Sequence, residues 1–314
     1  MGGTKILGCL LNSSGDIIQR VKTATDTSNG AERYTEDIAK LISEILEKSG
    51  IKTDQIKAVA LGVPGSLDPF SGIIKLAPNL NISNYNIKKS LDKILPMKVF
   101  VENDVNLGAL GIKNFGVGKE AKNMLAVFIG TGIGGGLILN EKIYRGSSFS
   151  AGEIGHFVIQ KDGPVCGCGN RGCIEAVASR TAIVKNIIED INEGKKSVLK
   201  KPVMEGKKIK SGILATAVKQ NDEVTIRRIS EACDKLGILL GGITNLLNLD
   251  LIVLGGGLIE ALDYFMLPLI KDSMKRSTMK DPFKTVSLKA SRLGDDAAIY
   301  GGIALVREFS GEDF

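Results

Sequence analysis

The chain's single histidine and three of its five cysteines lie between residues 156 and 173. Three thiolates and one imidazole make up the Cys₃His ligand set that suits tetrahedral zinc. The glycines between the cysteines allow the tight backbone bends that would bring the sulfurs together. Four protein ligands fill a tetrahedral site, so we expect a structural zinc ion with no position left for a catalytic water. The expected ligands are His156, Cys166, Cys168 and Cys173.

Other interpretations of this cluster stay open from the residues alone. The spacing is C-x-C-x₄-C, which is not the more common C-x₂-C of zinc fingers. The cysteines could instead be small buried side chains beside a hydrogen-bonded histidine. A disulfide accounts for the cluster less well, because three neighbouring cysteines leave one thiol unpaired. The remaining cysteines, Cys9 and Cys233, stand in apolar surroundings and are expected to be core residues.

Two carboxylates flank the expected metal site. Glu153 precedes His156 by three positions, and Glu175 follows Cys173 by two. An imidazole nitrogen that does not bind the metal keeps its N–H and can donate a hydrogen bond. The metal would thus hold two acceptors and one donor in a fixed arrangement. Such an arrangement suits a ligand rich in hydroxyl groups, such as a sugar.

The composition is that of a globular protein, with 43% hydrophobic and 24% charged residues among 314. The net charge of 41 − 35 = +6 is small and spread along the chain, which argues against a nucleic-acid-binding surface. The most basic stretch, residues 195–210, is expected to be a solvated loop between helices. No apolar run reaches the ~18 residues of a membrane span, and no signal peptide is evident. Reduced, clustered cysteines favour a cytoplasmic location.

Hydrophobic periodicity predicts strands and helices in the first third of the chain. Apolar residues recur at helical spacing over 32–49, and Gly50 ends that helix. Residues 68–87 are rich in Pro, Asn and Gly and are predicted to form a surface loop. Strands are predicted over 6–11, 17–21, 56–63 and 98–102, with a helix from about residue 106.

The opening pattern recurs in the middle of the chain. Gly3-Thr4 and Gly130-Thr131 both precede an apolar stretch that runs to a turn asparagine, at Asn12 or Asn140. We interpret this as a weak internal repeat, with chance as the alternative. The second part of the chain is predicted to contain a strand over 124–129, a loop over 130–136, a hairpin over 137–144, helices over 176–192 and 211–247, a strand over 251–254, a helix from about 258, a strand over 284–290 and a last helix over 297–309.

The glycine-rich loops indicate a phosphate site, since backbone N–H groups in such loops cradle phosphates. Gly130-x-Gly132-x-x-Gly135 fits the dinucleotide fingerprint, but it leads into a predicted strand rather than the helix that this motif requires. The P-loop sequence is absent. We therefore expect a nucleotide site that is neither Rossmann-type nor a P-loop. Ordinary tight turns are the alternative for each loop.

Asn103-Asp104 follows the strand predicted over 98–102, and ligand crevices of open α/β sheets form at the carboxyl ends of strands. An aspartate there could take the proton from an attacking hydroxyl, as phosphoryl transfer to a sugar requires. Taken alone, Asp104 fits a helix cap better than a base. The glycine loops and the carboxylates beside the expected metal site favour the interpretation of Asp104 as a general base.

Together these residues resemble the ROK family of sugar kinases, whose relatives include sugar-sensing repressors. The similarity is greatest to the family's bacterial and archaeal glucokinases, and it spans essentially the whole chain. It rests above all on Glu-x-Gly-His at 153–156 and C-x-C-G-x₂-G-C-x-E at 166–175. Further matching segments are Glu102-Asn103-Asp104, Gly130-Thr131-Gly132, the glycine run at 254–257 and Leu293-Gly-Asp-Asp296.

The resemblance implies an α/β fold of the actin-like ATPase (ribonuclease H-like) type, with two duplicated domains around a deep cleft. The N-terminal domain would cover residues 1–110 and be completed by a C-terminal helix at about 297–314. The C-terminal domain would cover 111–296 and carry the zinc site. The implied cofactors are ATP, Mg²⁺ and a structural Zn²⁺. A homo-oligomer, either a dimer or a tetramer, is also expected.

The resemblance further implies roles for individual residues. Asp104 would be the catalytic base. The residues implied to contact the sugar are Gly65, Asn79, Asn103, Asp104, Glu153, His156 and Glu175. Those implied to contact the phosphates of ATP are Gly3, Thr4, Lys5, Gly130, Thr131 and Gly132, and those at its adenosine end are Gly255 and Gly256.

One departure from the family concerns the start of the chain. Family members usually open with Asp-x-Gly-Gly-Thr, whose aspartate helps to place Mg²⁺, whereas Met1 stands at the x position here. A wrongly assigned start, a shortened chain and an impaired activity are the alternatives. The family's repressors carry a DNA-binding segment before the Gly-Gly-Thr loop, and no residues for one precede it here, so DNA regulation is not expected.

The expected function is ATP-dependent phosphorylation of a hexose. Glucose, converted to glucose 6-phosphate, is the first choice of substrate. Fructose, mannose, N-acetylmannosamine and N-acetylglucosamine are alternatives, because pockets discriminate a single substituent by only ~1–3 kcal/mol. A non-catalytic sugar-binding sensor is the alternative from another class of protein.

Overall fold

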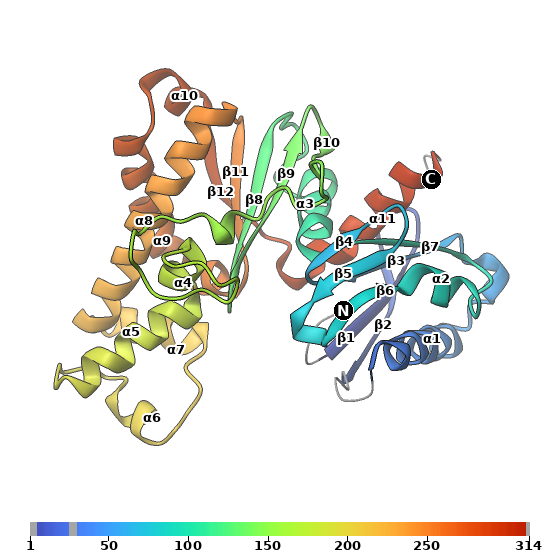
Figure 1. The fold of residues 1–314 in the computed structure, drawn as a ribbon, viewed down its shortest axis with the longest axis horizontal. Helices are drawn as coiled ribbons and strands as arrows, with labels where there is room; N and C mark the ends of the chain where they lie inside the picture. Colours follow the sequence, from blue (N-terminus) through green and yellow to red (C-terminus); the bar gives the residue numbers. More distant parts are fainter. Residues whose placement is uncertain (1–4, 25–29, 312–314) are drawn as a thin grey trace. The chain divides into compact units, whose positions relative to one another are not determined.

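A computed structural model of the chain describes residues 5–24 and 30–311. The chain divides into two compact units, each with its own hydrophobic core (Figure 1). Unit 1 consists of Met1–Lys119, Ile143–Ala151 and Asp295–Phe314, and unit 2 of Glu120–Lys142 and Gly152–Gly294. Each unit is therefore built from segments that are far apart in the sequence.

Unit 1 begins with an antiparallel hairpin of β1 (Lys5–Leu11) and β2 (Ile17–Ala24). Two further strands, β3 (Ala58–Val63) and β7 (Lys98–Asn103), pair in parallel. The helices of this unit are α1 (Gly30–Ser49), α2 (Ile87–Asp92), α3 (Asp104–Phe115) and α11 (Ala297–Ser310), with a short 3₁₀ turn η1 (Thr53–Gln55).

The prediction of a surface loop over 68–87 is wrong. Strands β4 (Ser66–Asp68), β5 (Ile73–Ala77) and β6 (Ile82–Asn86) form an antiparallel sheet here, with the 3₁₀ turn η2 (Pro78–Leu80) between the last two. Aliphatic side chains such as Ile74 and Ile82 are buried and hold this sheet to the core. Asn81 and Asn84 have positive φ. These asparagines therefore adopt single left-handed conformations within the sheet and do not mark a long loop.

Helices α3 and α11 approach closely because each contributes a glycine that packs against the backbone of the other helix. A Cβ on Gly111 would overlap the carbonyl oxygen of Ala297, and a Cβ on Gly301 would overlap that of Leu107. Side chains at these positions would push the two helices apart. The position of α3 matters for function because Asn103 and Asp104 stand at its start.

We expect Gly111→Ala to destabilise unit 1 by ~1–3 kcal/mol, because overpacking forces backbone shifts. A matched control is Gly242→Ala, since Gly242 lies inside a helix of unit 2 with open space where its Cβ would be. The control should gain about 0.5–1 kcal/mol from helix propensity. Urea unfolding followed by circular dichroism measures both, and equal stability of the two variants would refute the close contact.

Unit 2 contains a five-stranded sheet in the order β10-β9-β8-β11-β12. Its strands are β8 (Met124–Ile129), β9 (Ile133–Leu139), β10 (Lys142–Ile143), β11 (Leu251–Gly255) and β12 (Ser287–Ala290). Strands β8 and β9 form an antiparallel hairpin, while β8, β11 and β12 run in parallel. A hairpin followed by parallel strands is also the pattern of unit 1, which is consistent with a duplicated fold.

The helices of unit 2 differ in their bounds from the two long helices that were predicted. Ser179 separates α4 (Ile174–Ala178) from α5 (Arg180–Asn192), and its hydroxyl accepts a hydrogen bond from Ala182 N. Asp222 caps a new helix in the same way. Each predicted long helix is therefore divided in two at a polar capping residue, although its apolar periodicity continues across that residue. The remaining elements are η3 (Ile154–His156), α6 (Lys200–Met204), α7 (Ser211–Lys219), α8 (Glu223–Leu247), α9 (Gly257–Ser277), α10 (Lys280–Thr285) and η4 (Gly294–Asp296), the last at the border of the units.

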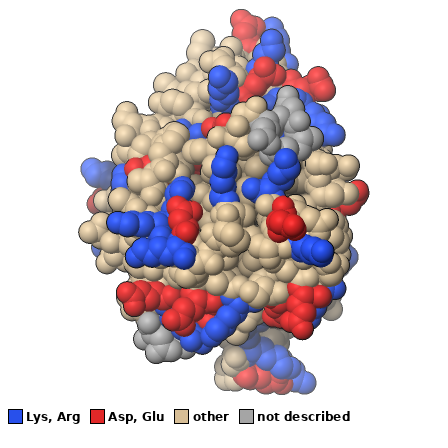
Figure 2. Space-filling model, turned by 90° about the vertical axis from the view of Figure 1, so that its right-hand side faces the viewer, with Lys and Arg blue, Asp and Glu red and all other residues tan. Residues whose placement is uncertain are grey.

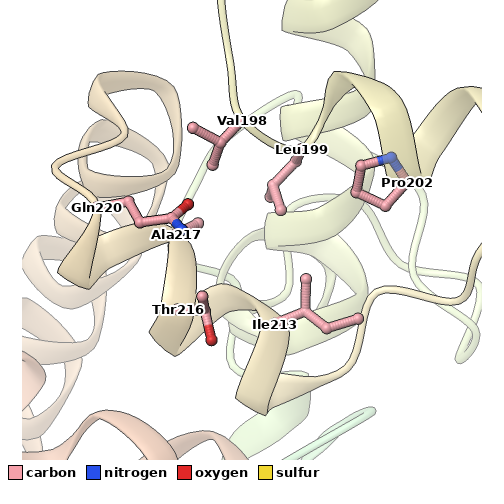
Figure 3. Close-up of a pocket in the computed structure, with 7 residues that line it drawn as sticks. All are labelled: Val198, Leu199, Pro202, Ile213, Thr216, Ala217 and Gln220. Carbon is pink, nitrogen blue, oxygen red and sulfur yellow. The ribbon is translucent and has the colours of Figure 1, made fainter.

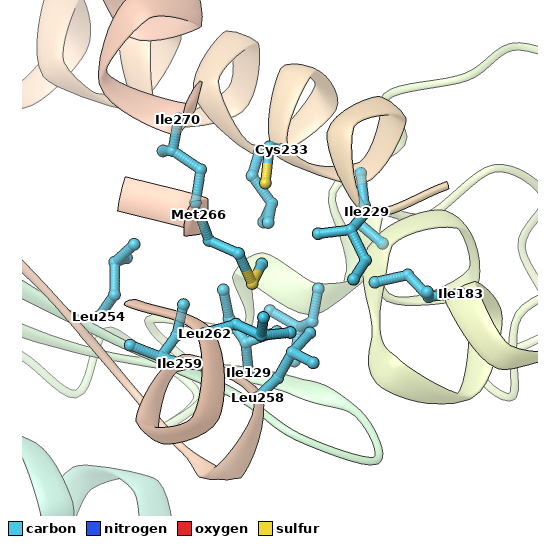
Figure 4. Close-up of a cluster of buried hydrophobic side chains, with 14 of the residues drawn as sticks. Ile129, Ile183, Ile229, Cys233, Leu254, Leu258, Ile259, Leu262, Met266 and Ile270 are labelled. Atoms are coloured by element: carbon cyan, nitrogen blue, oxygen red, sulfur yellow. The ribbon is translucent and has the colours of Figure 1, made fainter. Parts of the chain in front are cut away.

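Two smaller predictions also need correction. The hairpin strand predicted from residue 137 already begins at Ile133, and the strand predicted from 284 begins at Ser287 after α10. Figure 4 shows how aliphatic side chains from the sheet and from helices α5, α8 and α9 meet in the core of this unit. This core fixes the edge of the sheet at which β8 and β11 end.

A buried ion cluster links three segments of unit 2. The carboxylate of Asp190 is fully buried and accepts two hydrogen bonds from Arg228, at 2.6 and 2.7 Å. It also bonds Arg227 Nη2 at 2.6 Å and Lys195 Nζ at 2.5 Å. These cations, Arg228 foremost, hold the pKa of the carboxyl well below its usual range. The cluster therefore stabilises the protein above pH ~4, and this contribution is lost as the pH falls towards the lowered pKa.

We expect Asp190→Asn to destabilise the protein by ~1.5–3 kcal/mol, because a buried amide cannot accept all the charged hydrogen bonds that the Asp190 carboxylate receives. Asp281→Asn is the control, since Asp281 forms an exposed pair with Lys284 that should contribute less than ~1 kcal/mol. Chemical denaturation at neutral pH compares the two variants. A loss at Asp190 no larger than that of the control would show that the cluster is energetically neutral.

Candidate functional site

The four side chains of the Cys₃His set converge in unit 2. One ligand atom from each of them lies within 4.8 Å of all the others. Cys168 Sγ is 3.7 Å from Cys173 Sγ, and Cys166 Sγ is 3.6 Å from His156 Nδ1. In a tetrahedral zinc site with Zn–S bonds of ~2.3 Å, two sulfurs stand roughly 3.8 Å apart. The cluster therefore has the dimensions and the donor chemistry of such a site.

Backbone turns bring these side chains together. Cys166 N donates to Asn170 O at 2.8 Å, and Gly172 N donates to Pro164 O at 2.8 Å. Gly172 has φ +73°, and a side chain there would overlap Gln160 O, so only glycine fits at this crossing. An isolated bridge between Val158 and Cys173 then brings the segment after His156 beside the last cysteine.

The thiols of the cluster differ in acidity. Burial raises the pKa of Cys173 to about 12, whereas the backbone N–H of Asn170 lowers the pKa of Cys168. Metal ligation requires thiolates, so a metal that binds here must displace protons.

His156 and the two flanking glutamates occupy different positions around the cluster. His156 turns Nδ1 towards the sulfurs, and its Nε2 lies 4.0 Å from Glu153 Oε2. Glu175 lies on α4, the helix that begins directly after Cys173, and its Oε1 is 3.9 Å from Cys166 Sγ. Its other oxygen accepts a hydrogen bond from Ile133 N at 2.9 Å. Glu175 thus contacts both the cysteine cluster and the end of the Gly130–Gly132 loop.

Two glycine loops lie together at one edge of the unit 2 sheet. The first follows β8 and contains Gly130, Thr131 and Gly132. The second begins at Gly255, the last residue of β11, and continues with Gly256. The parallel pairing of β8 with β11 places both loops at strand carboxyl ends. Gly256 has φ +84°, and a Cβ there would lie within 3.0 Å of Ile129 backbone atoms. Backbone amides at such an edge suit an anionic ligand.

Helix α5 holds the first loop at several points that sequence reasoning missed. Arg180 N donates to Gly130 O at 3.0 Å, and its guanidinium donates to Thr131 Oγ1 at 3.0 Å. Thr181 Oγ1 donates to Thr131 O at 2.7 Å. These contacts tie the loop to the helix that continues from α4 and the cysteine cluster. In the sequence, only the polar pair Arg180-Thr181 directly after the Ser179 cap could have indicated these contacts.

A buried hydroxyl near the second loop was also missed. Ser211, the first residue of α7, is 7% exposed, and its hydroxyl bonds no protein group in the described part of the chain. A Cβ on Gly257 would lie 3.7 Å from this oxygen. A buried polar atom is costly unless it is hydrogen-bonded, so this hydroxyl is suited to bond a water or a ligand beside the loop.

The corner between β7 and α3 in unit 1 carries the predicted base. Asn103 caps α3, because its Oδ1 accepts from Val105 N at 2.9 Å and from Asn106 N at 3.1 Å. The helix therefore begins at Asp104, two residues earlier than predicted, and the cap is Asn103 rather than Asp104. Burial raises the pKa of Asp104 above its usual value. A raised pKa brings an aspartate closer to the range in which it can accept a proton from a hydroxyl.

The other predicted contact residues are placed less uniformly. Asn103 Nδ2 donates to Gly65 O at 3.0 Å, so these two residues lie together in unit 1. Asn79 is exposed on η2, and Lys5 is the exposed first residue of β1. Gly3 and Thr4 lie outside the described residues.

Two surface features of the molecule offer weaker alternatives. Figure 3 shows a pocket on unit 2, lined mainly by aliphatic side chains such as Val198, Leu199 and Ile213. Its hydroxyl, on Thr216, already bonds Gly212 O. The pocket is thus poorly suited to a sugar or a phosphate. On the face drawn in Figure 2, basic and acidic side chains are interspersed, which fits a modest net charge. Among the described helices, none has the length and apolarity needed to cross a bilayer.

The fold and site define a class of protein. A duplicated α/β chain with glycine loops at a sheet edge, a Cys₃His cluster and a half-buried aspartate at a helix start has the features of an actin-like sugar-phosphorylating or sugar-binding protein. The ROK family model matches residues 1–309, and the chain belongs to the ROK family. The family resemblance and the fold class inferred from the sequence are thereby confirmed.

Three individual relatives illustrate the range of the family. A glucokinase of Halalkalibacterium halodurans is 31% identical over 98% of this chain and 93% of its own length. The structure of a ROK glucokinase from Streptomyces griseus, in complex with glucose and AMPPNP, matches with a TM-score of 0.82 and 27% identity over 98% of this chain and 97% of that one. A ROK transcriptional regulator, described as a homologue of the E. coli MLC protein, matches with a TM-score of 0.89 and 25% identity over 98% of this chain and 76% of that one.

Proposed function

We propose that the protein is an ATP-dependent hexose kinase whose first substrate is glucose, phosphorylated to glucose 6-phosphate. The observation that carries this proposal is the position of Glu175, which contacts the Cys₃His cluster on one side and the Gly130–Gly132 loop on the other. A group that reads sugar hydroxyls beside a group that holds phosphates is the arrangement a sugar kinase requires. The glucokinase relatives support the same conclusion.

In this proposal the sugar is held mainly by hydrogen bonds to carboxylates, one amide and one imidazole. Glu153 and Glu175 accept from sugar hydroxyls, while His156 Nε2–H donates. The full set of sugar contacts is Gly65, Asn79, Asn103, Asp104, Glu153, His156 and Glu175. The nucleotide phosphates are bound by Gly3, Thr4, Lys5, Gly130, Thr131 and Gly132, and the adenosine end by Gly255 and Gly256, with Ser211 nearby.

Phosphoryl transfer then needs few protein groups. The 6-hydroxyl oxygen forms a bond to the γ-phosphorus, the bond from that phosphorus to the β–γ bridging oxygen breaks, and ADP leaves. Asp104 takes the hydroxyl proton. Mg²⁺, when bound with ATP, neutralises the charge on the phosphates. His156, Cys166, Cys168 and Cys173 would hold a zinc ion, which would fix the positions of His156 and α4.

The test of the proposal is ADP release in the presence of MgATP and a panel of sugars. We expect turnover with glucose, with lower kcat/KM for fructose, mannose, N-acetylmannosamine and N-acetylglucosamine. A higher kcat/KM for one of the other sugars would support the kinase activity and identify that sugar as the substrate in place of glucose. Absence of turnover with every sugar would remove the proposed activity.

The raised pKa of Asp104 predicts a pH dependence. A general base acts when deprotonated, so kcat/KM should fall as the pH drops through the pKa of Asp104. Since burial raises that pKa, the fall should begin at a higher pH than the usual ~3.9 of an aspartate. A pH–rate profile with a stability control at each pH measures it. A rate that stays flat down to pH 4 would argue against Asp104 as the base.

A second candidate function is a non-catalytic sugar sensor, which the structural match to a ROK transcriptional regulator favours. Such a protein would bind glucose or another hexose without transferring phosphate. Sugar binding measured by calorimetry, with no ADP release in the presence of MgATP, would support it. We further propose that the protein works in the cytoplasm as a homo-oligomer, without nucleic acid or membrane as a partner.

A further inference from the structure

The carboxylate of Glu102 holds the corner that carries Asn103 and Asp104. Glu102 is 1% exposed, and its Oε1 accepts hydrogen bonds from Asn103 N at 2.8 Å and Asn106 Nδ2 at 3.1 Å. One oxygen therefore bonds both to the last residue of β7 and to the first turn of α3. Asp104 stands between these two attachment points.

The second oxygen of Glu102 is bound by an arginine from a distant part of the chain. Arg145 Nε donates to Glu102 Oε2 at 2.7 Å. The two other nitrogens of the same guanidinium donate to Glu308 on α11, at 2.7 and 3.0 Å. The rings of Phe70 and Phe309 stand 5.8 and 5.5 Å from the guanidinium carbon. The Arg145 side chain is 10% exposed, so it is fixed from several sides.

Arg145 belongs to the segment Ile143–Ala151, which enters unit 1 between two segments of unit 2. Other contacts keep this segment on unit 1. Lys75 Nζ donates to Ser148 O at 3.1 Å, and the ring centroid of Phe149 lies 5.7 Å from that of Phe70. The arginine is therefore held in place by its own segment and not by its ion pairs alone.

We propose that Arg145 is a positioning residue for phosphoryl transfer, acting through Glu102 to fix the orientation of Asn103 and Asp104. This inference rests on the proposed kinase function. A buried carboxylate without a cation is costly and tends to rearrange or draw in water. The guanidinium of Arg145 supplies the positive charge that balances the Glu102 carboxylate, and its hydrogen bond fixes the direction of Oε2. Oε1 is then held where it accepts the hydrogen bonds from Asn103 N and Asn106 Nδ2. Arg145 itself touches neither Asp104 nor, in this assignment, the substrate.

The test compares Arg145→Gln and Arg145→Lys with Arg33→Gln in the full-length, zinc-loaded protein. Arg33 forms partly exposed ion pairs with Glu36 and Asp37 on α1, so its substitution removes an arginine from the same unit without touching the corner. We expect Arg145→Gln to lower kcat about 100-fold, as a misplacement of roughly 1 Å does, with an unchanged KM for MgATP. Arg145→Lys keeps the charge and should lose less than about 10-fold. Glu102→Gln combined with Arg145→Gln should recover part of the loss, since no buried charge is then left alone.

Amide hydrogen exchange provides a readout that needs no activity. In Arg145→Gln, exchange at Asn103, Val105 and Asn106 should rise about 10-fold or more, while the β1–β2 hairpin stays unchanged. Unchanged exchange and a kcat within about two-fold of wild type would overturn the inference and leave the kinase intact. An equal rise throughout unit 1 would also overturn it, because Arg145 would then be merely structural. If wild type shows no turnover, the kinase proposal fails, and exchange at the corner alone decides whether Arg145 fixes it.

Discussion

Asp104→Asn is expected to lower kcat by ~10²–10⁴ while the chain stays folded and still binds glucose. Asparagine keeps the shape of the side chain and can still accept the bond from Val105 N, which Asp104 Oδ1 receives at 3.0 Å. It cannot take a proton from the sugar hydroxyl. The loss should therefore appear in kcat, with a glucose affinity within a few-fold of wild type. Steady-state kinetics and calorimetry on one preparation separate the two effects.

The matched control is Asp92→Asn, which removes a carboxylate from an exposed pair with Lys88 in the same unit. It should leave kcat and glucose affinity unchanged. A variant at Asp104 that keeps more than about a tenth of the wild-type rate would show that another group is the base. Loss of glucose binding together with the rate would instead assign Asp104 to binding.

If the cluster binds zinc as proposed, removal of this ion is expected to abolish measurable glucose binding. His156 and Glu175 are held next to the cysteine cluster, and thiolates left without a metal repel one another or become protonated. Structural zinc is worth ~10–16 kcal/mol in zinc-finger peptides, but unit 2 has a large core of its own, so we expect local loosening rather than unfolding. Calorimetry before chelation, after chelation and after addition of zinc measures the effect, and zinc should restore binding.

Two cysteine variants make this result specific. Cys173→Ser removes a buried ligand and should reproduce the effect of the chelator, with less than one equivalent of zinc in the purified chain. Cys9→Ser removes a thiol that belongs to unit 1 and is not part of the cluster, so it should retain both zinc and glucose binding. A metal-free chain that binds glucose as tightly as wild type would refute the coupling between the cluster and the sugar site.

The Cys₃His cluster was predictable from the sequence because its members are close along the chain. Cys166, Cys168 and Cys173 need only short glycine turns to converge, so spacing and residue type carried the information. The pairing of β8 with β11, which brings the two glycine loops together, follows from the fold class rather than from any local signal. The loops themselves were visible as glycine runs.

The corner at Asp104 could be predicted only in part. The chain position at the end of a buried strand was visible, but the partners that fix it were not. Arg145 lies 43 residues from Glu102 and 163 from Glu308, and no periodic pattern links positions so far apart. The sheet of β4 to β6 was missed for another reason, because Asn and Gly mark single left-handed turns as readily as long loops. Likewise, the caps Ser179 and Asp222 interrupt helices whose apolar periodicity runs on.

The most direct measurement of the central claim is ³¹P NMR of the zinc-loaded chain with glucose and MgATP. The account predicts that a phosphomonoester signal matching glucose 6-phosphate grows in step with ADP, and that Asp104→Asn slows both together. Glucose binding by calorimetry without any new phosphomonoester, in wild type and with every hexose of the panel, would contradict it and identify a sugar sensor instead.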